Sequence, residues 1–520
     1  MTRNMNSLAP TSPFAPVGVL FMEAADSDLR DVMELAHAMI EGCPMLLECV
    51  EADLDAHGLA KKAARLADKK WEARNDLTIP GIDETETYHG SADVLLQGRK
   101  RTQGYVVLMT MLLRGFIGAG FKSQETMSLM QESKTLATVF SNLGMEMPRP
   151  STLTELVNAM SSDTYERVFD AQVAMIGRLE LDDFKTLIGD STHIRGNTEW
   201  PTDSRLLVDL GFRIARLGES IGRFGLPTLE VSRTGRHLDR MKRLDREITL
   251  RSGGSDRART RRRRYGKLLT AARRVHDLVT AQMSTISTAN EELDILPSKK
   301  AFADRVVEQL KADLIAFETV IVNCEARVLR DEKVRMDKKV LSVSDPDVAY
   351  IAKGQRDPVI GFKPQLGRSG SGFVTSMRVP RGNAADSNQL VPMVDDHARR
   401  TGVDPEIVSV DDGYSSKANV VALKKRNIEV ISIGGSKGRK LTSEEDWASQ
   451  PYVDARNIRS AVESLIYTLK NGFNFGYVAR RGLPNVVPEL IEKVLAYNFC
   501  HMVRTLKRRA AQQLEPAPVT

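Results

Sequence analysis

The stretch Thr186-Leu-Ile-Gly-Asp-Ser-Thr-His-Ile194 begins with apolar residues and turns polar at Asp190. This change is typical of a strand that emerges from a buried core. A second short run, Ile407-Val-Ser-Val-Asp411, ends in an aspartate in the same way. We therefore expect both segments to be strands of a sheet, with a carboxylate at the end of each.

Short strands and helices alternate after about residue 341. We first expect two strands, over 359–366 and 373–379, and then a helix over about 385–400 ended by Gly402. The strand over 407–411, a helix over about 417–426 and a strand over 428–433 follow. A final helix is expected over 456–471, ended by Gly472. Together with the first strand and a long helical interruption, this is the element order of the RNase H-like fold. The expected fold class is helix-rich α+β or α/β, with an RNase H-like mixed-sheet core, a large helical insertion and an N-terminal helical domain.

The rest of the chain is predicted to be largely helical. Residues 1 to about 175 have apolar residues at helical spacing and few β-branched runs. A helix-turn-helix between Ser123 and Met160 and a plain helical bundle fit this region equally well. Residues 201 to about 340 repeat apolar residues with a period near 3.6. The tail, from Leu514 to Thr520, is expected to be disordered.

Positive charge is concentrated in one region. The chain has 74 basic and 68 acidic residues, and 16 of the basic ones but only 4 acidic ones lie between Arg233 and Arg274. Such a local surplus is typical of a protein with a polyanionic partner. The four cysteines have no metal-ligand spacing, and the longest apolar stretch, 105–113, is too short to span a bilayer. We expect a soluble, cytoplasmic protein that does not enter a membrane.

Three acidic residues stand out by position. Asp190 and Asp411 end the two strands, and Glu463 lies in the last expected helix. In the RNase H-like order these positions converge on one edge of the sheet, where carboxylates hold two divalent cations. Oxygen ligands suit Mg²⁺ or Mn²⁺. Other aspartates could take the place of one of these three ligands. They are Asp182, Asp183, Asp386 and Asp412, the last of which is next to Asp411.

The expected helix over 456–471 has an apolar stripe with a charged edge. Arg456, Arg459, Glu463 and Lys470 fall together at that edge when each residue turns the helix by roughly 100°. A carboxylate among cations fits a site that binds both metal and phosphate. The simpler alternative is that Arg459 and Glu463 form an ordinary surface ion pair at i, i+4 spacing.

At these residues the sequence resembles the DDE transposases of bacterial insertion sequences, particularly the ISNCY-like group. The matching blocks are Gly189-Asp-Ser-Thr192, Trp200-Pro-Thr-Asp-Ser204, Asp345-Pro-Asp347, Gly361-Phe-Lys363, Gly382-Asn-Ala-Ala-Asp386, Asp411-Asp-Gly-Tyr414 and Arg459-x3-Glu463-x6-Lys470. The resemblance implies that Asp190, Asp411 and Glu463 form the catalytic, metal-binding triad. It also implies that Arg459 and Lys470 contact the transposon end. Many relatives have Tyr where this chain has Arg456.

The resemblance implies a DNA transposase that cleaves transposon ends with two metal ions and joins the freed 3′-OH to target DNA. A related nuclease without strand transfer and a catalytically silent DNA-binding derivative are the alternatives. We expect Arg261, Arg262, Arg263 and Arg264 to hold DNA backbone, and we expect a homodimer or higher assembly on DNA. The expected segments are 1–175 for DNA-end binding, 176–200 and 341–505 for the catalytic core, 201–340 for the insertion and 506–520 for the tail.

Overall fold

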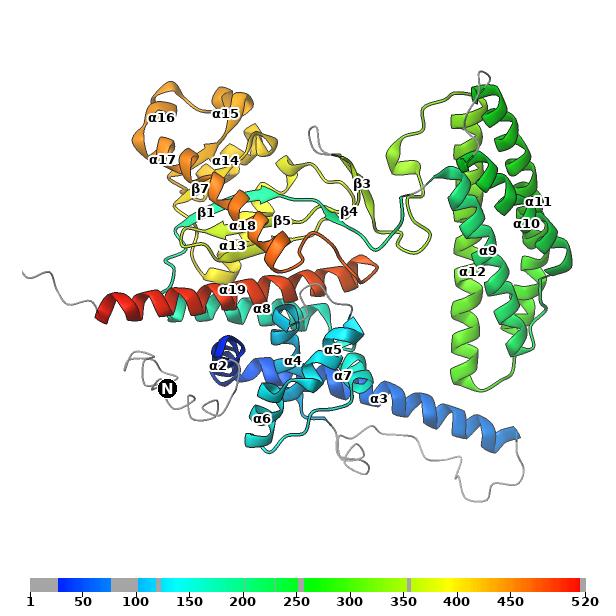
Figure 1. The fold of residues 1–520 in the computed structure, drawn as a ribbon, viewed down its shortest axis with the longest axis horizontal. Coiled ribbons are helices and arrows are strands. Elements are labelled where there is room, and N and C mark those ends of the chain that lie inside the picture. The colour runs from blue at the N-terminus through cyan, green and yellow to red at the C-terminus, as the bar shows by residue number, and fades with distance from the viewer. Residues whose placement is uncertain are drawn as a thin grey trace, which may run out of the picture. The chain divides into compact units, whose positions relative to one another are not determined.

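The computed structural model describes residues 27–75, 102–117, 123–200, 202–229, 231–250, 257–352 and 357–514. It is rich in helices and contains a mixed sheet, which agrees with the expected α+β class (Figure 1). The chain divides into two compact units. The first comprises residues 1–57, 98–197 and 347–520, and the second comprises residues 58–97 and 198–346.

A five-stranded sheet forms the centre of the first unit. Its strands are, in spatial order, β6 (Val374–Arg378), β5 (Gln365–Ser369), β1 (Thr186–Ser191), β7 (Ile407–Val410) and β8 (Val430–Ile433). Strand β1 pairs antiparallel with β5 and parallel with β7. Strands β5 and β6 are antiparallel, whereas β7 and β8 are parallel. Gly189 is in register with Val410, so Asp190 and Asp411 come next on neighbouring strands.

Helices cover both faces of this sheet. Helix α13 (Leu390–Thr401) and helix α14 (Lys417–Lys425) contribute to a buried apolar cluster with β1, β7 and β8. Gly402 ends α13 in the left-handed conformation that glycine favours, as expected from the sequence. Helix α17 (Gln450–Ile458) packs on β7 and β8, and α18 (Ser460–Gly472) packs on β1 and β5. Val408 and Val410 belong to the α13 cluster while Ser409 bonds α17, so the two groups of helices lie on opposite faces.

The single strand expected over 359–366 is wrong, because Pro364 divides it. Strand β4 (Val359–Phe362) pairs instead in a second sheet, between β2 (Ile194–Arg195) and β3 (Ala349–Ile351). Proline has no N–H for a ladder, so the chain leaves one sheet at Pro364 and enters the other at Gln365. The Pro364 carbonyl accepts a hydrogen bond from Thr192 N–H at 3.0 Å, which joins the two sheets beside β1.

A long helix that was not expected, α19 (Leu483–Leu514), follows the helix that was predicted to be the last. It contacts the helices α2 (Ser27–Glu41), α4 (Gly104–Ile117) and α8 (Ser162–Arg178) as well as β6. Figure 1 shows α19 with α8 beneath the sheet. The helical structure thus continues through residues 506–514 of the segment predicted as the 506–520 tail, whereas residues 515–520, for which disorder was predicted, lie outside the described residues.

The remaining N-terminal elements are also helices, as predicted. They are α3 (Pro44–Asn75), α5 (Ser123–Glu132), α6 (Lys134–Asn142) and α7 (Pro150–Asn158). Helix α4 is buried from Gly104 to Gly115, which explains why its sequence is apolar on all sides. No helix among the described residues is both long and apolar enough to cross a membrane.

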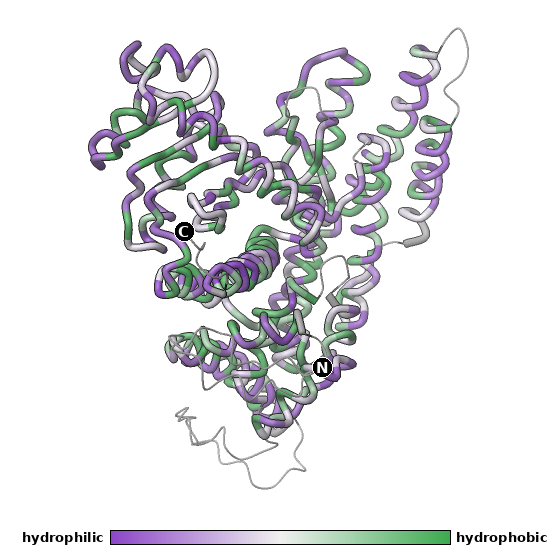
Figure 2. Tube along the Cα trace, turned by 60° about the vertical axis from the view of Figure 1, so that its left-hand side comes forward, coloured by the Kyte–Doolittle hydropathy of each residue, from purple (hydrophilic) through white to green (hydrophobic). Residues whose placement is uncertain are grey.

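The second unit contains a bundle of four helices, α9 (Asp203–Ile221), α10 (Val231–Leu250), α11 (Arg257–Glu291) and α12 (Pro297–Cys324). Its buried core includes Leu207, Ile214, Leu268 and Phe317. Green and purple stretches alternate along these helices in Figure 2, as expected for amphipathic helices. The Arg-rich segment, from Arg257 to Arg264, forms the first turns of α11.

Gly115 marks a close approach of α4 to α19. A β-carbon placed on Gly115 would lie 2.1 Å from the backbone oxygen of Glu492. We expect Gly115→Ala to lower the free energy of unfolding of the first unit by about 1–3 kcal/mol, because two helix backbones must separate. Gly472→Ala, where nothing lies within 4 Å, is the matched control. Equal midpoints for both variants in chemical denaturation would contradict this packing.

Candidate active site

Asp190 and Asp411 lie side by side at one edge of the five-stranded sheet. Asp190 is 7% exposed, and its Oδ1 accepts a hydrogen bond from Ser191 N–H at 2.7 Å. The Oδ1 atom of Asp411 accepts one from Gly413 N–H at 2.9 Å. Because Leu187 and Val410 face α13, alternation places both aspartates on the face that α17 and α18 cover.

Asp412 has different surroundings from its neighbour Asp411. Its Oδ1 accepts hydrogen bonds from the backbone N–H groups of Lys437 and Gly438, both at 2.9 Å, and from the hydroxyl of Ser415 at 3.1 Å. Burial opposes the charge of Asp412, but these hydrogen bonds lower its pKa. The Asp412 carboxylate therefore fixes the turn into α15 (Gly435–Leu441).

Asp386 is the centre of a partly buried hydrogen-bond network. Lys363 Nζ lies 2.8 Å from its carboxylate, and Gln365 Nε2 donates to it at 2.9 Å. Burial raises the pKa of Asp386, but hydrogen bonds from Lys363, Gln365 and Ser191 outweigh this and lower it. The hydroxyl of Tyr414 donates to Gln365 Oε1, so the network reaches the turn after Asp411.

Tyr414 links this network to the neighbouring carboxylates. Its side chain is fully buried, and burial together with the charges of Asp386, Asp190 and Asp411 raises its pKa well above the ordinary value. A β-carbon placed on Gly413 would lie 3.0 Å from Asp411 Oδ1 and 3.2 Å from Asp386 Oδ2. Tyr414 therefore remains a neutral donor beside three carboxylates.

The network connects the two chain segments that carry Asp190 and Asp411. Ser191 follows Asp190 and bonds Asp386, whereas Tyr414 follows Asp411 by three residues. Sequence reasoning named Asp386 only as a substitute and missed the role of Gln365. Two sequence blocks could have indicated this network, because they contain its two ends, Lys363 and Tyr414. The blocks are Gly361-Phe-Lys363 and Asp411-Asp-Gly-Tyr414.

The prediction of one helix over 456–471 is wrong, because this segment belongs to two helices, α17 and α18, with a bend at Arg459 between them. The carbonyl of Ala455 accepts a hydrogen bond from Ser409 Oγ at 2.6 Å, in place of the usual bond within the helix. Arg459 N–H instead bonds the carbonyl of Arg456 at 3.4 Å. A side chain inserted into the helical ladder is a known cause of a bend, and here it comes from β7.

Glu463 lies on α18 and pairs with Arg459. Arg459 Nη2 and Glu463 Oε1 are 2.9 Å apart, and the Glu463 side chain is 57% exposed. A β-carbon placed on Gly434, after β8, would lie 3.7 Å from Arg459 Cδ and 3.5 Å from the carbonyl oxygen of Val410. The Arg459 side chain therefore passes the end of β7, where Asp411 follows.

The expected cluster of three carboxylates is not assembled in this structure. Among the described residues, no three His, Cys, Asp or Glu side chains are grouped closely enough to hold a metal ion. Asp190 and Asp411 are neighbours, whereas Glu463 is held by Arg459. Two adjacent carboxylates still fit Mg²⁺, which proteins usually hold through one or two carboxylates together with water and substrate phosphates.

The other predicted DNA contacts do not gather around Glu463. Arg456 lies over the ring of Trp447 in α16 (Glu444–Ala448), 4.9 Å from its centroid. Lys470 lies about two turns beyond Glu463 along α18. The Arg261–Arg264 run belongs to the second unit, where Arg262 donates to the carbonyl of Val328 at 3.0 Å. Arg264 donates to that of Glu247 at 2.8 Å, and Arg261 lies 5.7 Å from the ring centroid of Tyr265.

Residues 331–499 match the family model described as the transposase DDE domain. The match confirms, for this segment, the resemblance to DDE transposases that the motifs indicated. The matched segment contains Asp386, Asp411 and Glu463, whereas β1 and Asp190 precede it. No curated protein and no solved structure matches the chain.

The buried network predicts a specific effect of Tyr414→Phe. The change removes the donor to Gln365 Oε1, and a buried acceptor without a donor costs about 1–3 kcal/mol in the free energy of unfolding. We also expect weaker Mn²⁺ binding, measured by electron paramagnetic resonance without DNA, because the segments carrying Asp190 and Asp411 lose a common support.

Tyr467→Phe on α18 is the control for Tyr414→Phe, since that side chain is 71% exposed. It should change neither the free energy of unfolding nor Mn²⁺ binding. A Tyr414→Phe protein with unaltered Mn²⁺ affinity would contradict the positioning role.

Proposed function

We propose that this protein is a DNA transposase with an interrupted RNase H-like core. The observation that carries the proposal is the placement of Asp190 and Asp411 at the ends of adjacent parallel strands, with a transposase DDE domain over residues 331–499. The strand order supports it, because three antiparallel strands (β6, β5, β1) continue into two parallel ones (β7, β8). In the RNase H-like fold, that arrangement brings acidic residues to one edge.

The long separation of the two aspartates is consistent with this core. Asp190 and Asp411 are 221 residues apart in the chain. The bundle α9–α12 lies between β1 and β5 in sequence and has its own buried core. An insertion of this kind leaves the pairing of β1 with β5 and β7 undisturbed, so the sheet forms as if the chain were continuous.

In the proposed reaction, Asp190, Asp411 and Glu463 would hold Mg²⁺ or Mn²⁺. Two such cations would supply activation of the attacking oxygen and stabilisation of the leaving one at the scissile phosphate. Glu463 must first leave Arg459, whose guanidinium then becomes available to a DNA phosphate. The network around Asp386 keeps the first two carboxylates in place. At the same site the freed 3′-OH would then attack a phosphodiester of target DNA, forming a new ester bond while the target bond breaks and releases a target 3′-OH.

Partners follow from the same proposal. Helices within residues 1–175 would recognise transposon ends, and Arg456, Arg459, Lys470 and the Arg261–Arg264 run would contact DNA. Because two ends are processed together, a homodimer or higher assembly on DNA is expected. We place the protein in the cytoplasm, on the nucleoid when it is bound to DNA.

One observation favours a second candidate, a catalytically silent DNA-binding derivative. Glu463 is engaged with Arg459, so two neighbouring carboxylates remain at the sheet edge. A silent derivative would keep this arrangement in the presence of DNA and metal. Mg²⁺-dependent cleavage by the unaltered protein excludes this candidate, and a joined product distinguishes a transposase from a nuclease that only cuts.

The triad predicts a separation of binding from cleavage. We expect Asp190→Asn, Asp411→Asn and Glu463→Gln to keep DNA binding, measured by gel shift, and each to abolish Mg²⁺-dependent cleavage. The substrate is a plasmid that carries the DNA flanking the gene. Glu444→Gln, an exposed glutamate that pairs with Arg439, is the control and should cleave normally. Cleavage retained by any of the three variants counts against that residue.

The Arg459–Glu463 pair predicts opposite effects on metal and DNA. Arg459→Met should strengthen Mn²⁺ binding in the absence of DNA, because Glu463 loses its competing cation. The same change should weaken binding to a duplex that carries the transposon end, since a phosphate contact is removed. Isothermal titration measures both affinities. Unchanged Mn²⁺ affinity would show that the ion pair does not compete with the metal.

A further inference from the structure

Two rows of cations follow α10 and the first half of α11. The first row has spacing i, i+4, i+7 and the second has spacing i, i+4, i+8, i+15, so each lies on one side of its helix. All seven side chains are exposed, and they are Arg236, Arg240 and Arg243 on α10 and Arg259, Arg263, Lys267 and Arg274 on α11. We call this surface the α10–α11 face.

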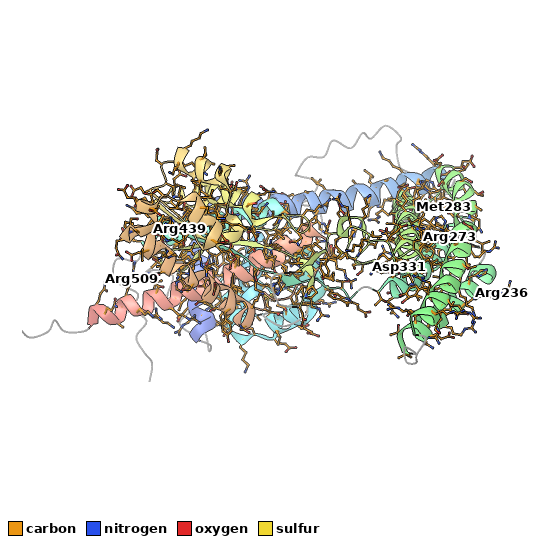
Figure 3. All side chains as sticks on the ribbon, turned by 90° about the horizontal axis from the view of Figure 1, so that it is seen from above. Arg236, Arg273, Met283, Asp331, Arg439 and Arg509 are labelled. Atoms are coloured by element: carbon orange, nitrogen blue, oxygen red, sulfur yellow. The ribbon has the colours of Figure 1, made fainter. Side chains whose placement is uncertain are left out.

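The α10–α11 face points away from the core of the bundle. On α10 the buried residues include Leu238 and Met241, and on α11 they include Leu268, Ala272 and Val275. At roughly 100° per residue these positions lie on the side of each helix opposite the cations. The two helices pack against each other, and Figure 3 shows Arg236 on the outer side of the bundle.

Six of the seven cations of this face have no hydrogen bond or ion pair within the described part of the chain, and only Arg259 has a partner. By contrast, Arg262 and Arg264 on the same turns of α11 are engaged with Asp331 and Glu247. The stretch 258–276 contains no acidic residue at all. Of the Arg261–Arg264 run, Arg263 therefore belongs to the α10–α11 face, whereas Arg262 and Arg264 are engaged within the second unit.

The α11 row is unfavourable for the bundle alone, whereas on α10 the exposed Asp239 lies between Arg236 and Arg243. Like charges three or four residues apart destabilise a helix, and no acid on α11 compensates them over five turns. A polyanion that lies along both rows would remove this repulsion. A membrane surface is a poor partner, because the apolar sides of both helices are already used in the bundle core.

We propose that the α10–α11 face binds the phosphate backbone of duplex DNA without reading its sequence. The inference rests on the proposed function for the choice of DNA as the polyanion, and it gives the insertion a specific role. Arginines that contact phosphates position a protein on the duplex and carry no sequence information. The rows are held on rigid helices, so they present their charges without the entropy cost of ordering a flexible arm.

The test compares two triple variants that remove the same charge from the second unit. Arg236→Gln/Arg240→Gln/Arg243→Gln removes free cations of the α10–α11 face. The control, Arg205→Gln/Arg330→Gln/Arg335→Gln, removes exposed cations that are already paired with Asp209, Glu332 and Asp337. Binding of a fluorescent duplex of random sequence is measured by anisotropy between 50 and 200 mM salt.

The first variant should bind DNA more weakly than the unaltered protein. The slope of the logarithm of its binding constant against the logarithm of the salt concentration should also be less steep. The expected change is about 0.9 for each phosphate that the protein no longer neutralises, or about 2.7 for three. The control should keep the slope of the unaltered protein. A charge-reversed Arg240→Glu protein should show the same trend, and circular dichroism confirms that all variants fold. An unchanged slope overturns the proposal, as does stronger competition by duplex RNA or anionic vesicles than by DNA.

The outcome is separable from that of the proposed function. If the unaltered protein cleaves DNA while the first variant keeps its full salt slope, the inference fails alone. If the slope falls as expected but the unaltered protein never cleaves, the proposed catalysis fails and the DNA-binding face stands.

Discussion

The parallel pairing of β1 with β7 is the interaction on which the rest of the first unit depends. Gly189 and Val410 are in register, and this contact places Asp190 beside Asp411. A β-carbon on Gly189 would lie 2.4 Å from Met393 Cε, so β1, helix α13 and β7 are packed too closely here for any side chain larger than that of glycine. Because neighbouring strands are about 4.8 Å apart, this one register sets the spacing of both carboxylates.

Such a pairing is costly to form between segments so far apart in sequence. Closing a loop costs entropy that grows with its length. The intervening bundle reduces this cost, because it has its own buried core and forms a compact unit. The chain therefore joins two strands across a folded body and not across a long flexible loop.

Local features of the fold could be predicted from the sequence, and tertiary ones could not. The strands ending at Asp190 and Asp411 are marked by a change from apolar to polar residues, and Gly402 ends α13 as its local chemistry requires. The bend at Arg459 could not be predicted, because its cause is the hydroxyl of Ser409 on a distant strand. Helix α19 was missed because its buried, largely apolar middle shows no clear helical period.

The same distinction applies to the candidate site. Chain order and motif spacing pointed to Asp190, Asp411 and Glu463, but they could not show that Glu463 is held by Arg459. Similarly, Asp411 and Asp412 are alike in sequence, and only the turn at Lys437 and Gly438 distinguishes them. Arg456 and Trp447 are nine residues apart on two different helices, so their contact depends on how those helices meet.

The position of helix α19 late in the chain determines when the packing of the first unit can be completed during synthesis. It contacts α2, α4 and α8 as well as β6, and residues 483–514 leave the ribosome after all of them. Until then, α4 can pack on α2, α5 and α7, and α8 on α2 and α13, but the surfaces that α19 covers have no partner. The parts of α4 and α8 that α19 covers therefore stay exposed while residues 179–482 are synthesised, and they become buried only when α19 packs against them.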